Sequence, residues 1–148
     1  MSALTGLKLK TLVICSTLFA GLFGNAIAQA EVVYFDTYRY AAVAYSTTTG
    51  KYGYAYNHGT LAGAKKTALG HCEADDAEIV GWVQGGFLVL AIGDDNSYGV
   101  GWEYGDGARI RDAAATAEAN CKSYGTQVVK LVYLCSGDIA PRIVTTQP

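Results

Sequence analysis

Two patterns of apolar and polar positions recur along this chain. Between Tyr52 and Asn57, tyrosines alternate with small residues, which predicts a strand with one aromatic face and one nearly bare face. From Leu61 to Cys72, small and apolar side chains recur every three or four residues instead, which predicts a short amphipathic helix with Thr60 as its N-cap. Apolar runs at 40–46 and 78–83 predict two further strands. One unit therefore has the order strand, strand, helix, strand.

The same order returns in the second half of the chain, with strands at 87–92, 98–104 and 127–135 and a helix at 108–121. The two helix-end cysteines, Cys72 and Cys121, are 49 residues apart, so the copies differ only by small loop changes. We predict a single α+β domain over 40–136, made of the repeats 40–86 and 87–136. The two β-β-α-β units are expected to form one antiparallel or mixed sheet with both short helices on one face, packed against the strand glycines.

The N-terminal residues of the chain predict export. Two lysines, an apolar run over 11–23 and small residues before Ala28 or Ala30 are typical of a secretory signal peptide at 1–30. That run is shorter than the roughly 20 residues that span a bilayer, so no membrane span is expected after the signal is removed. The protein should be periplasmic or secreted. Residues 31–39 are predicted to form an N-terminal arm, and 137–148 a loose C-terminal tail.

Charge and composition narrow the range of partners. The formal net charge is -2, and removal of Lys8 and Lys10 with the signal would make the chain more acidic. Nucleic acid or an anionic membrane calls for a clustered basic face, which is absent from the sequence. The acidic turn at Asp94 and Asp95 lacks the spacing of a calcium loop, and two histidines without a Cys-x-x-Cys motif offer no zinc site. We therefore expect neither a metal nor a cofactor.

Three cysteines remain after the signal, and an oxidising compartment favours a disulfide. The repeat offset places Gly86 at the first-copy position equivalent to Cys135. We predict a Cys121–Cys135 bridge that closes a loop of about 15 residues and stabilises the fold by about 3 kcal/mol. Cys72 is then a free thiol buried on its helix.

The alternating strands also carry a candidate binding surface. If both helices cover the bare face, the rings on the other face could bind a protein or a glycan; alternatively, these rings form the core or pack under the N-terminal arm. The residues concerned are Tyr52, Tyr54, Tyr56, Tyr98, Trp102 and Tyr104.

The doubled pattern resembles the exported bacterial domain-of-unknown-function family 4189. The resemblance spans about Tyr40 to Ser136 and rests on short motifs in the right order, which are Ala42-Val43-Ala44-Tyr45-Ser46, Tyr52-Gly53-Tyr54-Ala55-Tyr56, Leu90-Ala91-Ile92-Gly93 and Tyr98-Gly99-Val100-Gly101-Trp102. It implies a small exported domain, often bridged by cysteines, and supplies no catalytic residues. Family members often carry further cysteines near Asp76 and Gly86, which this chain lacks.

These features predict a non-enzymatic exported binding protein with a protein or cell-envelope partner. One specific form is a periplasmic immunity or inhibitor protein against a secreted toxin. The alternatives are a secreted effector that acts on a host or competitor, a thiol enzyme, and a small hydrolase with a site built from His58, Glu103 and Asp106. The sequence does not specify the oligomeric state.

Overall fold

A computed structural model describes residues 38–146, so the predicted signal peptide and most of the predicted N-terminal arm lie outside the described residues. The elements follow in the order β1 (Tyr40–Tyr45), β2 (Tyr52–His58), α1 (Leu61–Cys72), β3 (Glu78–Gln84), β4 (Gly86–Gly93), β5 (Tyr98–Tyr104), α2 (Ile110–Lys122), β6 (Val128–Cys135) and β7 (Arg142–Thr145). Both repeat units are present in the predicted order, and the α+β class is confirmed.

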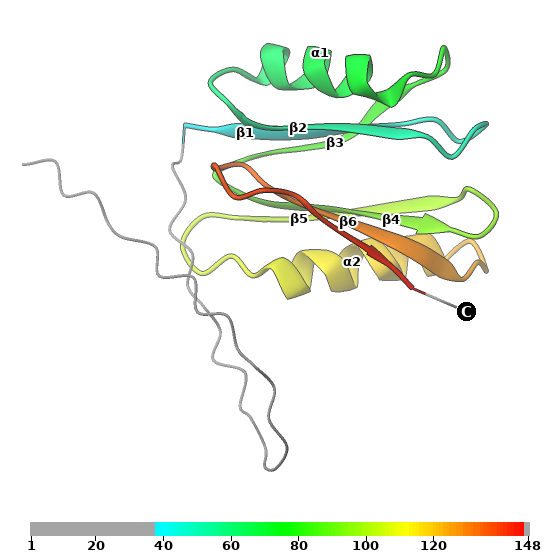
Figure 1. The fold of residues 1–148 in the computed structure, drawn as a ribbon. Coiled ribbons are helices and arrows are strands. Elements are labelled where there is room, and N and C mark those ends of the chain that lie inside the picture. Colours follow the sequence, from blue (N-terminus) through cyan, green and yellow to red (C-terminus); the bar gives the residue numbers. More distant parts are fainter. Residues whose placement is uncertain (1–37, 147–148) are drawn as a thin grey trace, which may run out of the picture.

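The strands form two antiparallel sheets, with the orders β2-β1-β3 and β5-β4-β6-β7. The sheets stack face to face, with α1 on the outside of the first and α2 on the outside of the second (Figure 1). The prediction of one sheet with both helices on the same face is therefore wrong. Each unit builds its own helix-covered sheet, and the two units then bury their remaining apolar faces against each other.

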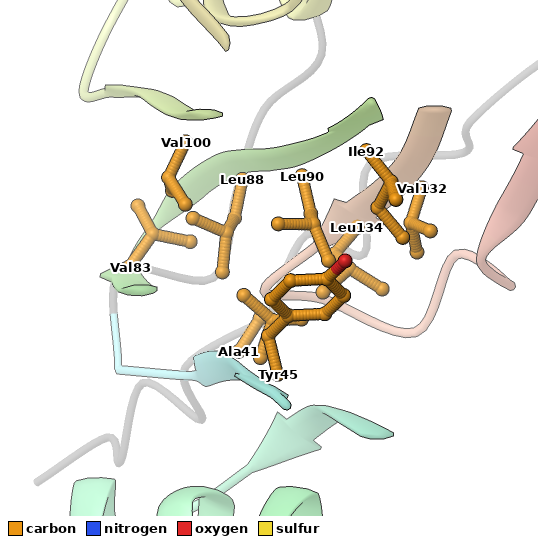
Figure 2. Close-up of a cluster of buried hydrophobic side chains, with 10 residues drawn as sticks. Ala41, Tyr45, Val83, Leu88, Leu90, Ile92, Val100, Val132 and Leu134 are labelled. Carbon is orange, nitrogen blue, oxygen red and sulfur yellow. The ribbon is translucent and has the colours of Figure 1, made fainter. Parts of the chain in front are cut away.

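The core between the sheets explains why two sheets form. Tyr45, Leu88 and Leu90 point into the space between the layers, together with valines and leucines from both units (Figure 2). β4 is buried at every position, because one of its faces meets α2 and the other meets the first sheet. A strand that is apolar on both faces needs cover on both sides, and a second sheet provides it.

Glycines set the distance between each helix and its sheet, as the alternating pattern predicts. A Cβ built on Gly53 would lie 2.2 Å from the backbone oxygen of Ala68, and one on Gly101 would lie 2.0 Å from that of Ala113. No side chain fits at such distances, so the glycines allow α1 and α2 to lie directly on β2 and β5. α1 begins at the predicted N-cap, where the Thr60 hydroxyl accepts a hydrogen bond from the Gly63 amide at 3.1 Å.

The contacts of the two helices repeat between the units. His71 on α1 contacts the Tyr54 carbonyl oxygen at 3.0 Å, and at the equivalent place Asn120 on α2 donates to the Val100 carbonyl at 2.9 Å. Because a carbonyl oxygen only accepts, His71 donates from Nδ1. The outer edges of β2 and β5 are therefore each contacted by a side chain of their own helix.

The predicted Cys121–Cys135 disulfide is absent: both cysteines are free, buried thiols, and so is Cys72. Cys121 lies over Gly99, which pairs with Ala91, whereas Cys135 pairs with Phe87. Four residues of β4 separate these positions by about 13 Å, well beyond the roughly 7 Å that bridged Cα atoms allow. The physical reason is that a helix and the strand after a short loop run antiparallel, so their C-terminal ends lie apart.

The expectation of a loose tail is also wrong in part, because residues 142–145 form β7. This strand pairs antiparallel with β6 in the register Lys130↔Thr145 to Tyr133↔Arg142. Val144 packs against the cluster beneath α2. The short Ile-Val-Thr run is apolar and β-branched enough to extend the second sheet by one strand.

Candidate functional site: a groove at the edge of the sandwich

A surface groove of about 650 Å³ lies where β3 packs against β5. Both strands are at the edges of their sheets, on the same side of the sandwich. We call this feature the β3–β5 groove; its lining consists of Lys65, Ile79, Val80, Gly81, Trp82, Val83, Gln84, Trp102 and Tyr104.

Three large rings line the groove and remain exposed: Trp82 is 46% exposed, Trp102 53% and Tyr104 69%. Trp82 lies on the α1 side of the first sheet, where its ring meets the Lys65 amine. Trp102 pairs with Leu88, a residue of the inter-sheet core, so its ring lies on the face of β5 that is turned toward the first sheet. The two tryptophans therefore approach the β3 edge from opposite faces.

At the centre of β3, Gly81 presents no side chain. A Cβ on Gly81 would lie 2.7 Å from a Val100 methyl carbon, so glycine is needed there for the sheets to approach. The local charge comes from Lys65, whose Nζ lies 5.6 Å from the Trp82 ring centroid. A cation over an exposed aromatic face contributes about 0.5–1 kcal/mol and holds the amine at the groove. The groove thus combines aromatic surface, a strand edge and one positive charge.

The candidate binding surface from the sequence is divided by the fold. Trp102 and Tyr104 line the groove, whereas the tyrosines of β2 and Tyr98 are partly buried against the inter-sheet core. Tyr52 stacks on Tyr54 with ring centroids 6.5 Å apart, and its ring is also contacted by Lys130. The tyrosines of β2 and Tyr98 therefore pack against the core, as the second alternative expects, whereas Trp102 and Tyr104 are exposed and their role in binding stays a prediction.

Sequence reasoning missed Trp82 and Lys65 as site residues. Trp82 lies in an apolar run that is typical of a buried strand, and Lys65 lies beside the small-residue stripe of its helix. The polar Gln84, two residues after Trp82 at the end of the strand, was the available signal. Only the topology places that strand at an edge.

The residues of the hydrolase alternative belong to different parts of the fold. His58 ends β2 close to Gly63 at the start of α1, whereas Glu103 pairs with Phe87 in the second sheet and Asp106 follows in a loop. Within residues 38–146, no hydrogen bond or ion pair joins the three. This arrangement lacks the base within hydrogen-bond reach that general acid–base catalysis needs.

The thiol alternative also lacks a reactive geometry. Cys72 is 1% exposed, its sulfur contacts the Lys51 carbonyl oxygen at 3.4 Å, and burial raises the pKa of its thiol. Its neighbour His71 is engaged with the Tyr54 carbonyl. A buried, protonated thiol without a base is a packing residue rather than a nucleophile.

The acidic turns are used within the fold. The Thr126 hydroxyl donates to Asp94 at 2.5 Å, and the Ser46 hydroxyl donates to Asp76 at 2.7 Å, which lowers the pKa of the Asp76 carboxyl. Each bond links a hairpin turn to the loop that follows the helix of the same unit. Residues 38–146 contain no cluster of three or more metal-ligating side chains.

Comparison with known proteins gives one match. The model of a family described as a domain of unknown function, DUF4189, matches residues 40–135. Neither a curated protein nor a solved structure matches the chain. Among the described residues, no helix has the length and apolar character needed to cross a membrane.

Proposed function

We propose that this chain, which belongs to the DUF4189 family, is an exported, non-enzymatic binding protein that takes a protein partner in the β3–β5 groove. The observation that carries the proposal is the position of Trp82, Trp102 and Tyr104, all exposed around one groove. Tryptophan and tyrosine are enriched at the centres of protein interfaces, where each buries a large area at low entropic cost.

A specific form of this function is an immunity or inhibitor protein that binds a secreted toxin in the periplasm. The small domain, the acidic net charge and the signal-like N-terminus support it. So does the separation of the histidine, acidic and thiol groups from one another, which favours binding over turnover.

The test is a pull-down from envelope extract with the purified protein as bait. We expect a stoichiometric protein partner that is lost in the double variant Trp82→Ala, Trp102→Ala. The matched control is Tyr124→Ala, which removes a ring that is 70% exposed in the loop after α2, away from the groove lining. Circular dichroism should show that all variants are folded.

Two outcomes would contradict the proposal. Capture that is equal for the wild type and the double tryptophan variant would place the binding site elsewhere. A hydrolytic turnover that His58→Ala abolishes without unfolding the protein would make the chain an enzyme.

A further inference from the structure

Three of the four outer strands in the two units have a backbone contact beyond their neighbouring strand, whereas β3 pairs with β1 alone within residues 38–146. Side chains of α1 and α2 contact β2 and β5 at the carbonyls of Tyr54 and Val100, and β6 is covered by β7. Figure 1 shows β7 beside β6 in the second unit.

The repeat identifies which residues of β3 correspond to those that bind β7. Ala42 packs beneath α1 and pairs with Trp82, and Val89 packs beneath α2 and pairs with Tyr133. Trp82 is therefore the equivalent of Tyr133, which pairs with Arg142 of β7. The β3–β5 groove lies where a strand equivalent to β7 would run.

We propose that the outer edge of β3 around Trp82 binds an extended peptide segment of the partner protein as an added antiparallel strand, with an acidic side chain opposite Trp82 and beside Lys65. This inference rests on the proposed function and specifies its mode of recognition. Strand addition supplies main-chain hydrogen bonds along the edge, and the side chains on either face supply specificity.

Charge supports an acidic residue at that position. In the second unit, a groove beneath α2 brings Glu118 of the helix and Arg142 of the strand together around Tyr133, and Arg111 of the helix also lines that groove. In the first unit the helix presents Lys65 above Trp82 instead. Opposite charge on the incoming strand complements that amine, and a basic residue would be repelled.

The flanking rings fit the alternation of a strand. Successive side chains of an added strand point to opposite faces, one toward Lys65 and Trp82 on the α1 side and the next toward Trp102 and Tyr104. Apolar side chains at the second set of positions would bury against the two rings. The expected peptide is therefore acidic on one face and apolar on the other.

A peptide based on β7 tests this proposal without knowledge of the natural partner. The probe has the sequence of residues 140–146 with Arg142→Glu. The chain contains two tryptophans, both in the groove, so tryptophan emission reports on this site alone. We expect saturable changes in emission, with the unaltered Arg142 peptide about two- to fivefold weaker, the upper part of the range that one exposed charge pair spans.

Two controls separate strand addition from other contacts. In Lys65→Glu the preference should invert, so that the Arg142 peptide binds more tightly than its Glu counterpart. Methylation of the peptide's backbone amides should abolish binding, because it removes the donors of the strand ladder. Equal binding of the methylated peptide, or no emission change with the Glu peptide at millimolar concentration, would overturn the proposal.

Other occupants of the edge give distinct results. A concentration-dependent dimer in sedimentation that Trp82→Glu abolishes would assign the edge to a second copy. If the peptide binds the variant Val33→Pro but not the wild type, the edge of β3 would be assigned to the chain's own N-terminal residues. Either result overturns the partner-strand inference. A pull-down that requires both tryptophans while the Glu peptide fails would overturn strand addition and leave the binding function standing.

Discussion

Lys65 lies over the ring of Trp82, with its Nζ 5.6 Å from the ring centroid. This contact joins the outer surface of α1 to the edge of β3. Lys65 is the only charged side chain in the lining of the β3–β5 groove.

Loss of this contact should cost little stability, because it is exposed. We expect Lys65→Met to lower the free energy of unfolding by about 0.5–1 kcal/mol, measured by urea denaturation. Lys66→Met changes the neighbouring lysine, which lines no part of the groove, and is the matched control. A loss in Lys66→Met as large as that in Lys65→Met would show that the effect is general to helix charge.

Alanine substitutions at Gly53 and Gly70 of the first unit should change the stability of the protein in opposite directions. Gly53→Ala would push a methyl group to 2.2 Å from the Ala68 oxygen and the Cys72 nitrogen, which displaces α1. We expect a loss of about 1–3 kcal/mol or more, as for other overpacked sites. Gly70 has nothing within 4 Å, so Gly70→Ala should stabilise the helix by up to about 1 kcal/mol. The measurement is thermal unfolding, and a shift of Tm in the same direction for both variants would contradict this view.

The three buried thiols should be unreactive in the folded protein. Burial raises the pKa of the thiols of Cys72, Cys121 and Cys135, so little thiolate forms near pH 8. Titration with Ellman's reagent should be slow until guanidinium unfolds the chain, after which all three react. A cross-linked peptide containing Cys121 and Cys135 in a non-reducing digest of native protein would contradict the fold.

Tyr45 should make stability fall at high pH. Its hydroxyl donates to the Asn96 carbonyl at 3.0 Å, and burial, followed by the nearby Cys121 and Asp95, raises its pKa to about 12. In the unfolded chain the Tyr45 hydroxyl ionises near pH 10. The contribution of Tyr45 to the free energy of unfolding is therefore complete below pH 10 and is lost as the pH rises to about 12.

The variant Tyr45→Phe isolates this effect. Between about pH 9.5 and 11.5, urea unfolding should show a decline about 2 kcal/mol smaller in Tyr45→Phe than in the wild type, at 1.36 kcal/mol per pKa unit. Parallel pH profiles for the two proteins would show that Tyr45 is not the group responsible.

Most elements were predictable because their patterns are local. The alternation at Tyr52 to Asn57, the stripe ending at Cys72 and the N-cap at Thr60 depend on neighbouring residues, and the structure contains each element within a residue or two. β7 was missed because a run of four residues carries too weak a period to be distinguished from a tail. Half of these groove residues were found from the sequence: Trp102 and Tyr104 stand on a strand of distinctive pattern, whereas Trp82 and Lys65 do not.

The sequence by itself determined the repeat, the α+β class and the close packing of each helix on its own glycine strand, because spacing along one chain fixes which side chains share a face. Only the tertiary structure decided that the units form two stacked sheets, that Cys121 and Cys135 lie at opposite ends of β4, and that β3 is the last strand of its sheet among the described residues. These features depend on contacts between residues far apart in sequence, and apolar periodicity does not encode which strands become neighbours.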